Sequence, residues 1–296
     1  MKGQVSNSDY YFYNQFQRAV YPSLNNSGGD PKFITDLTHD ELVEFHDSNY
    51  HPSNSKTFSY GNFPLINTLK TLNDEFVKYG RRNNTLQKLF PIDFNNGNTK
   101  HIKVDGYFDP MFPKEKQYKS SLTWNCGSTR DVYDSLLLKI LSSILLDGQS
   151  SIFYQQLIET GLGTDFSINT GIESQTEANL LSIGLQGMNA QDVDKLPSLM
   201  NNIFKEFISK PIDSSKIDAI LHQIELSKKD HKSNFGMQLL YSVQPGWAID
   251  IDPFKILNFD ELINKFKEDY KTQGNELFYN LIKKTFLTGN DSNGYL

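Results

Sequence analysis

Disulfide bonds and membrane spans are the first features that this sequence lacks. The 296 residues contain one cysteine, Cys126, so the chain forms no internal disulfide. This excludes the secreted scaffolds that depend on disulfides, and it favours a reducing compartment. The longest apolar helix candidate, residues 136–146, is too short and too polar at its edges to cross a bilayer. The first residues have neither the charged start and apolar stretch of a signal peptide nor the Arg-rich pattern of a transit peptide.

Positive charge is also scarce. The chain has 29 Lys and Arg against 35 Asp and Glu, which gives a net charge of −6. A nucleic-acid-binding face needs clustered Lys and Arg, so a nucleic-acid partner is not expected. The acidic balance suits cationic partners, and ordinary solubility explains it equally well. The length allows one large domain or two of ordinary size, of which we expect two.

The densest local signals lie between residues 21 and 61. Thr38 and Glu41 form a capping box, which predicts that a helix begins there. His51-Pro52 ends this helix, because proline disfavours the helical conformation of the residue before it. Residues 56–60 then alternate in the manner of a half-buried strand.

The remaining pattern predicts helices on either side of a sheet-forming region. An aromatic stripe ending before Pro22 predicts a first helix packed on a core, and Pro64 begins another helix that ends at Gly80. A helix from residue 189 to 210 contains Pro197, which indicates a kink or a later start. The other expected elements are strands 101–107, 117–124, 166–170 and 180–186, helices 131–146, 152–158 and 217–224, and a helical tail 235–287 interrupted at 245–247 and 252–253. This order describes an α+β domain with an antiparallel sheet covered by helices.

No complete catalytic or metal-binding set is visible. The six histidines are at positions 39, 46, 51, 101, 222 and 231, and no two of them are four apart with a glutamate on the same face, as a metalloprotease helix requires. His39 and His46 could share a helix face, but without a third ligand we interpret them as one solvated and one half-packed side chain. Phosphate-binding glycine motifs and a GxSxG elbow are also absent. We therefore assign no catalytic and no metal-binding residue.

Several segments resemble one known family. The segments NSGGDP (26–31), LTHDELVEFHDSNYHPSNS (37–55) and Tyr60-Gly61 are similar to the region that follows the active-site helix in presequence proteases. These enzymes belong to the pitrilysin and insulysin group of zinc metallopeptidases, which carry the inverted HxxEH motif. Further similar segments are 145–163, 245–247, 252–253 and 279–287, so the resemblance extends over nearly the whole chain.

The resemblance implies two consecutive pitrilysin-like domains, of which the first is incomplete. Residues 1–80 would be the end of the first, catalytic-type domain, 81–100 a linker, and 101–296 a second, non-catalytic domain. The family builds a closed chamber from four such domains. HxxEH is absent here, and the third zinc ligand of the family, a glutamate, would precede Met1. Met1 therefore resembles an internal methionine of a longer parent. Zinc is expected in that parent and not in this chain, and the substrate-clamping Arg/Tyr pair would lie in the missing carboxyl half.

The resemblance implies that this chain is part of a mitochondrial zinc metalloendopeptidase. Such an enzyme would be located in the matrix or the intermembrane space. Such an enzyme degrades cleaved presequences and other short unstructured peptides, with zinc activating water and the HxxEH glutamate as general base. The expected partners are those peptides and the missing halves of the parent chain, with no nucleic acid and no membrane. The one candidate for substrate binding is the loop of Ser27, Gly28, Gly29 and Asp30, because tight glycine turns let the backbone approach a ligand. A plain structural turn is the alternative.

Two other hypotheses remain open. The chain could be a non-catalytic, peptide-binding or structural subunit of the same superfamily. It could also be a truncated product without a role of its own, whose partial first domain would expose apolar surface. Zinc content and chelator-sensitive peptidase activity distinguish the protease from the subunit, and we expect neither in the isolated chain.

Overall fold

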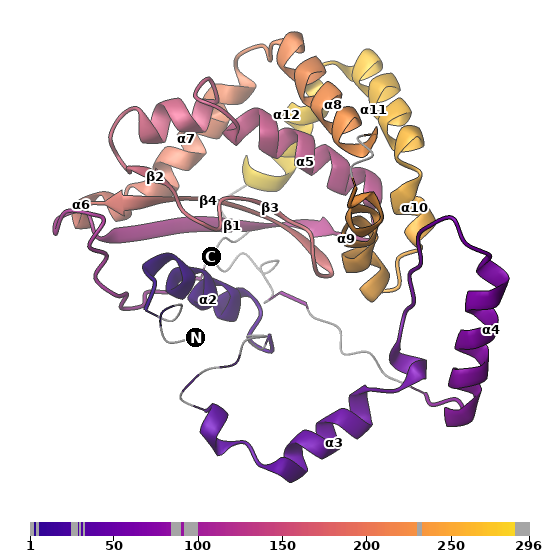
Figure 1. Ribbon diagram of the computed structural model, residues 1–296. Coiled ribbons are helices and arrows are strands. Elements are labelled where there is room, and N and C mark those ends of the chain that lie inside the picture. Colours follow the sequence, from indigo (N-terminus) through magenta and orange to yellow (C-terminus); the bar gives the residue numbers. More distant parts are fainter. Residues whose placement is uncertain are drawn as a thin grey trace.

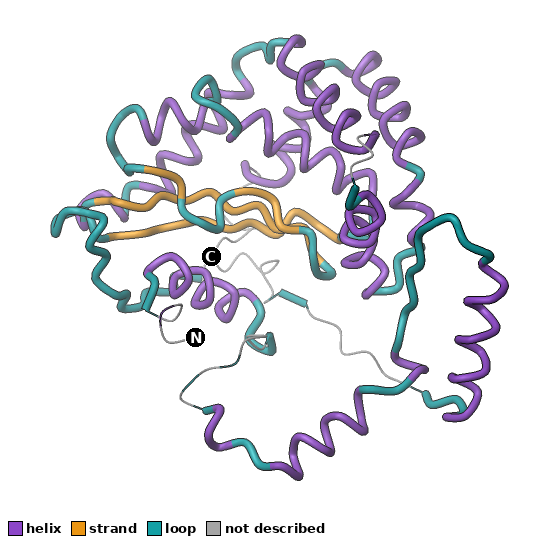
Figure 2. The backbone as a smooth tube through the Cα atoms, in the orientation of Figure 1, coloured by secondary structure: helices purple, strands orange, loops and turns teal. Residues whose placement is uncertain are grey.

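The computed structural model describes residues 3, 6–24, 29, 31, 33–83, 90–91, 100–229 and 233–287. Its centre is one antiparallel sheet with a layer of helices on one face and a single helix on the other (Figure 1). Two further helices extend away from this body (Figures 1 and 2). The α+β class expected from the sequence is confirmed.

The sheet is built around one long strand. Its strands are β1 (Tyr118–Ser128), β2 (Asp165–Phe166), β3 (Gly171–Glu173) and β4 (Ala178–Met188), and β4 pairs with each of the others. Leu122 lies opposite Ile183 in the β1–β4 pair. Because side chains alternate along a strand, these two face the helices, whereas the neighbouring Thr123 and Ser182 face the other side, where their hydroxyls lie 2.8 Å apart.

The core lies between the sheet and the helix layer. α5 (Val132–Leu146) crosses the sheet directly, and nine of its 15 residues are buried. Asp131 caps it by accepting from the backbone N–H of Asp134 at 2.9 Å. The ring of Phe204 packs edge-on against Trp124 of β1, with ring centroids 5.7 Å apart. The helices that complete this layer are α7 (Leu196–Ile208), α8 (Ser214–Lys229), α11 (Phe259–Gln273) and α12 (Glu276–Ile282).

Proline has different effects in the helices α7 and α9 (Phe235–Ala248). Pro197 stands in the first turn of α7, after the short α6 (Ala190–Val193), so the later start allowed by the sequence is the one observed. Pro245 lies inside α9, which continues past it, so the interruption predicted at residues 245–247 is wrong. Because Pro245 is near the carboxyl end, its missing N–H removes one hydrogen bond and leaves the preceding turns intact.

The other helices and helical turns complete the order of elements. α10 (Pro253–Leu257) begins at Asp252, whose carboxylate accepts from the Phe254 backbone N–H at 2.9 Å. The shorter helical turns are Ile34–Asp36, Pro52–Asn54, Val77–Tyr79, Tyr154–Ile158 and Lys283–Leu287. Within the residues that the structure describes, no helix combines the length and the apolar character needed to cross a membrane.

The helix α2 (Ser8–Val20) covers part of the sheet face that points away from the helix layer (Figure 1). Its cap is Asn7, whose side chain accepts from the Tyr10 backbone N–H at 2.9 Å. Phe16 and Val20 are buried against Leu180 of β4 in a small second core. The expected packing role of this stripe is therefore confirmed for Phe16 and Val20.

Two segments predicted as strands do not pair. Residues 56–60 and 101–107 belong to no strand of the described sheet, so both predictions are wrong for this structure. The alternating pattern is present, but a strand also needs a neighbour that receives its backbone hydrogen bonds. The expected linker at 81–100 lies largely outside the described residues, and the domain boundaries derived from it remain a prediction.

Gly184 of β4 has no space for a side chain. A Cβ placed there would lie 2.3 Å from Ser121 Cβ and 2.6 Å from the Ser120 carbonyl oxygen. We expect Gly184→Ala to lower the free energy of unfolding by about 1–3 kcal/mol, because the two strands must separate locally. Thermal unfolding followed by circular dichroism measures the change. Gly106→Ala is the matched control, since a Cβ at Gly106 would meet nothing within 4 Å; equal effects of the two substitutions would refute the argument.

Glu173 of β3 makes the stability depend on pH. Burial raises the pKa of its carboxyl group above the ordinary value. The folded state therefore binds a proton more tightly than the unfolded state, so this group costs stability as the pH rises from the ordinary pKa through the raised one. We expect Glu173→Gln to stabilise the chain more at pH 7, where the native carboxyl group must ionise in a buried position, than at pH 4, where it is largely protonated in both states. Unfolding curves at both pH values test this; exposed Glu159→Gln serves as control, and a gain that is independent of pH would contradict it.

Candidate functional site

The described residues hold no metal centre. No group of three His, Cys, Asp or Glu side chains among them is placed to bind a metal ion. His39 and His46 are both exposed on α3 (His39–Asn49), with 84% and 64% of their side-chain surface accessible, so the expectation that one of the two is half-packed is wrong. The carboxylate of the next residue lies near each ring, Asp40 at 3.7 Å from His39 and Asp47 at 3.3 Å from His46, and the His46 ring also stacks on the Tyr50 ring with centroids 5.0 Å apart. The residues that the structure describes do not fit a zinc site.

The loop singled out for substrate binding is described at one position only. Gly29 has φ of +70°, the left-handed conformation that glycine adopts without strain. A Cβ there would lie 3.4 Å from the Ile34 side chain. Ser27, Gly28 and Asp30 lie outside the described residues. The sharp turn is consistent with the sequence, and a role of this loop in substrate binding stays a prediction.

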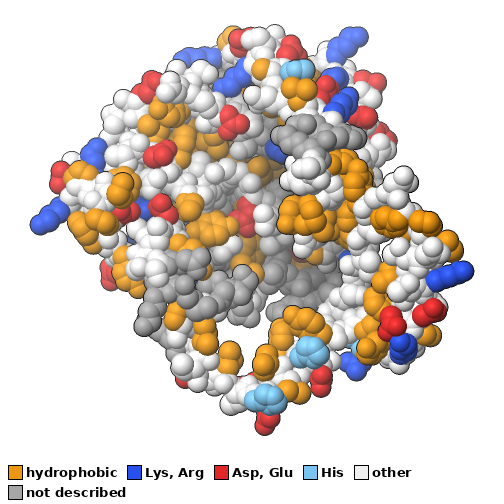
Figure 3. Space-filling view, in the orientation of Figure 1, with side chains coloured by type: hydrophobic (Ala, Val, Ile, Leu, Met, Phe, Trp, Pro, Cys, Tyr) orange, Lys and Arg blue, Asp and Glu red, His pale blue; other side chains and the backbone are white. Residues whose placement is uncertain are grey.

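The most unusual surface of the chain is the apolar face of two helices that have no core of their own. α3 and α4 (Leu65–Phe76) contain no buried residue, in contrast to the largely buried α5. We call this surface, with its adjoining turns, the uncovered arm. Figure 3 shows hydrophobic side chains gathered along it. Its large exposed apolar residues are Phe33, Ile34, Leu37, Leu42, Val43, Phe45, Tyr50, Tyr60, Phe63, Leu65, Ile66, Leu69, Phe76, Val77 and Tyr79.

The local sequence nevertheless specifies both helices well. The Thr38 hydroxyl accepts from the Glu41 backbone N–H at 3.3 Å, and the Glu41 carboxylate accepts from the Thr38 N–H at 2.8 Å, so the predicted capping box is confirmed. These hydrogen bonds lower the pKa of Glu41 below its ordinary value. In α4, Ile66, Leu69 and Phe76 repeat at helical spacing, which is typical of a face packed on protein. The helices form, but the surface that this pattern requires is not among the described residues.

The exposure carries a substantial energetic cost. Leu42, Phe45 and Leu69 are 65%, 59% and 51% exposed. Full burial of one such side chain stabilises a protein by about 1.5–3 kcal/mol. Single exposed apolar residues are normal, but a contiguous patch marks an interaction surface. Segments 56–60 and 101–107 pair with no strand of the described sheet. In the second segment, the apolar side chains Ile102 and Val104 are about half exposed.

The uncovered arm touches the helical body at the amino and carboxyl ends of α9. Lys56 Nζ lies 2.9 Å from Asp250 Oδ1 and also donates to the Trp247 carbonyl oxygen. The Tyr60 ring meets the Phe235 ring with centroids 5.9 Å apart. Asp250 lies in the turn that follows α9. Arg130 binds the same turn, where it donates to the Ile249 carbonyl oxygen at 2.8 Å. This turn after α9 therefore joins the arm to the sheet.

These features define an α+β chain that has a sheet-and-helix core and the uncovered arm. A comparison with family models assigns the chain to a family. Residues 36–224 match the family model described as "Peptidase M16 inactive domain". The chain belongs to the M16 peptidase family. The expected resemblance to the pitrilysin group is thereby confirmed.

Individual relatives agree with this assignment. The chain is 53% identical over 284 residues to "Presequence protease, mitochondrial" of Kluyveromyces lactis and 51% identical over 286 residues to the protein of the same name of Saccharomyces cerevisiae. Each alignment covers 96% of this chain and 28% of the relative. The chain thus spans little more than a quarter of the length of these relatives. The crystal structure of a peptidase M16 inactive domain from Pseudomonas fluorescens shares the fold, with a TM-score of 0.61 at 16% identity, over 99% of this chain and 66% of that one.

The arm gives a direct test of where stability resides. We expect Leu69→Lys to change the free energy of unfolding by less than about 0.5 kcal/mol, because the side chain is exposed, and to reduce aggregation. Leu141→Ala in α5 removes a fully buried side chain and should cost about 2–5 kcal/mol. Urea unfolding and static light scattering measure the two effects. A loss of stability in Leu69→Lys as large as that in Leu141→Ala would show that the arm is already packed.

Proposed function

We propose that this chain is a non-catalytic part of a mitochondrial zinc metalloendopeptidase that degrades cleaved presequences and other short unstructured peptides. Support comes from the 53% identity to a relative named mitochondrial presequence protease and from the share of that relative, 28%, that the chain spans. In this proposal residues 1–80 end one peptidase domain, 81–100 link, and 101–296 form the next. Zinc, its ligands and the general base belong to the rest of the longer protein.

The observation that carries the proposal is the uncovered arm. Its two helices are capped and amphipathic, yet their apolar faces meet no core among the described residues. The alternating segment 56–60 lies between them without a partner strand. Helices with an apolar face and a strand without a sheet are what remains when an α+β domain lacks part of its sheet. We therefore assign the covering surface to the missing part of the same peptidase domain.

A peptidase assay with metal analysis tests the proposal. We expect the isolated chain to bind no stoichiometric zinc after dialysis and to cleave no fluorogenic peptide, because the described residues bring no three ligands together. The same residues within a longer protein that carries HxxEH should show zinc and chelator-sensitive cleavage. Zinc is measured by mass spectrometry and cleavage by fluorescence.

The outcomes separate the alternatives. Chelator-sensitive cleavage by the isolated chain would refute the non-catalytic assignment. A longer protein with no zinc that still binds peptides would favour the alternative of a peptide-binding subunit. Charged substitutions in the arm supply a control: Leu69→Lys should reduce the yield of active longer protein, whereas exposed Leu226→Lys on α8 should not. Equal yields for both substitutions would remove the support that the arm gives.

A further inference from the structure

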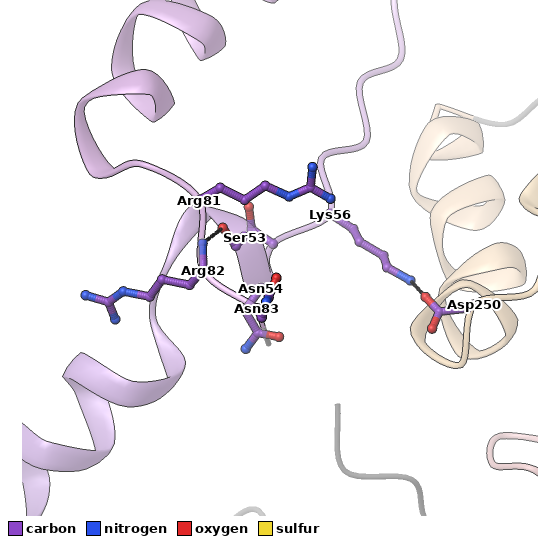
Figure 4. A pocket seen from close by; sticks show the side chains of 8 residues that line it. Ser53, Asn54, Lys56, Arg81, Arg82, Asn83 and Asp250 are labelled. Atoms are coloured by element: carbon purple, nitrogen blue, oxygen red, sulfur yellow. Dashed lines mark hydrogen bonds and ion pairs between the residues drawn. The ribbon is translucent and has the colours of Figure 1, made fainter. Parts of the chain in front are cut away.

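A polar pocket lies where the uncovered arm meets the turn after α9. It has a volume of about 420 Å³. It is formed by residues 53–56 of the arm, residues 81–83 after its last helical turn, and Asp250. Figure 4 shows the side chains that line it. Residues 53–55 belong to the segment 37–55 that carries the family resemblance, but the proposed function assigns no role to this pocket.

The charge of the pocket is opposite to that of the chain. Lys56, Arg81 and Arg82 line it against one carboxylate, Asp250, in a protein of net charge −6. Two of the four arginines in the sequence are gathered here. The other lining residues are neutral and polar: Ser53, Asn54, Ser55 and Asn83. The pocket thus has a local excess of positive charge and of hydrogen-bond donors.

These cations are incompletely neutralised. Lys56 pairs with Asp250 at 2.9 Å. Arg82 donates from its guanidinium to the neutral Asp47 carbonyl oxygen at 2.9 Å, and from its backbone N–H to Ser53 Oγ at 3.0 Å, which fixes the chain at this point. The Arg81 guanidinium forms no hydrogen bond or ion pair with the residues that the structure describes. Figure 4 shows Arg81 extending on the side of Lys56, whereas Arg82 points away.

We propose that this pocket binds an oxyanion, either a carboxylate or a phosphate group, between Arg81 and Lys56. The planar guanidinium offers two parallel N–H donors that match the oxygens of such a group, and Lys56 adds a point charge. The hydroxyl and amide groups of the neutral lining residues supply further donors. This site does not depend on the proposed function, because it is formed entirely by side chains of this chain.

A bound oxyanion would compete with the Asp250 carboxylate for Lys56. Asp250 has φ of +65°, the one positive value among the non-glycine residues described. Its carboxylate already neutralises Lys56, so an incoming oxyanion meets electrostatic repulsion from Asp250 and competes with it for the ammonium group. Asn tolerates the left-handed conformation well, so Asp250→Asn removes this negative charge with little backbone cost.

Isothermal titration of the whole 296-residue chain with sodium pyrophosphate and, separately, with sodium succinate tests the proposal. We expect saturable binding of at least one of the two, and the tighter one identifies phosphate or carboxylate as the preferred group. Arg81→Gln should weaken that binding about tenfold, the effect of losing a charge-assisted hydrogen bond. Lys70→Gln, which removes the same charge from exposed α4, should change it less than about twofold.

Asp250→Asn should have the opposite sign and tighten binding. The proposal fails if neither anion binds saturably, or if Arg81→Gln and Lys70→Gln weaken binding equally, since that would be a response to net charge alone. Circular dichroism shows whether each variant is folded. Should Arg81→Gln not fold, Asp250→Asn decides: an affinity equal to or weaker than that of the unsubstituted chain overturns the proposal.

Discussion

The burial of α5 against the β1–β4 pair is the interaction on which the rest of the structure depends. Leu141 and Leu145 are fully buried, and they share one core cluster with Leu122 and Ile183 of the sheet. α8 and α11 contact α5 directly, and α7 and α12 join the same core through contacts with each other and with residues 283–287. One contiguous core of this kind is what holds residues 118–229 and 233–287 together.

The uncovered arm differs from this core. The sequence specifies its local structure, but no packing partner for its apolar faces lies among the described residues. A capping box and helical spacing are enough to define α3 and α4 in the sequence. Tertiary burial normally supplies most of the stability of such helices, and the described part of the chain does not provide it for α3 and α4. The polar and aromatic contacts around α9 are the tie that the described residues provide. They place the arm beside the sheet, but they bury little apolar area.

The sequence predicted most elements of the core, since each has a signal of its own, but the strand expected at 166–170 is wrong beyond Phe166, where a turn connects β2 and β3. Leu181, Ile183 and Leu185 lie on one face of an alternating segment, and this pattern predicted β4. The broad apolar stripe around Leu141 predicted α5. Predictions that required a partner failed: residues 56–60 and 101–107 alternate, but alternation cannot say whether a neighbouring strand exists. The break at Pro245 failed for another reason, because the effect of a proline depends on how many turns follow it. The oxyanion pocket was not foreseen, since Lys56, Arg81 and Asp250 are distant in sequence and no motif links them.

The turn after α9 shows how one short segment can couple both halves of this architecture. Arg130 holds it from the sheet side through the Ile249 carbonyl oxygen, and its guanidinium also binds the buried Glu177 carboxylate at 2.8 and 3.0 Å. Lys56 holds it from the arm side. A buried carboxylate left without Arg130 would be strongly destabilising, so the sheet side of this turn is fixed. The Lys56–Asp250 pair is more exposed and contributes less, so the arm side is the weaker of the two attachments. The Lys56–Asp250 pair is therefore the weaker link in the path that leads from the arm through this turn to the sheet.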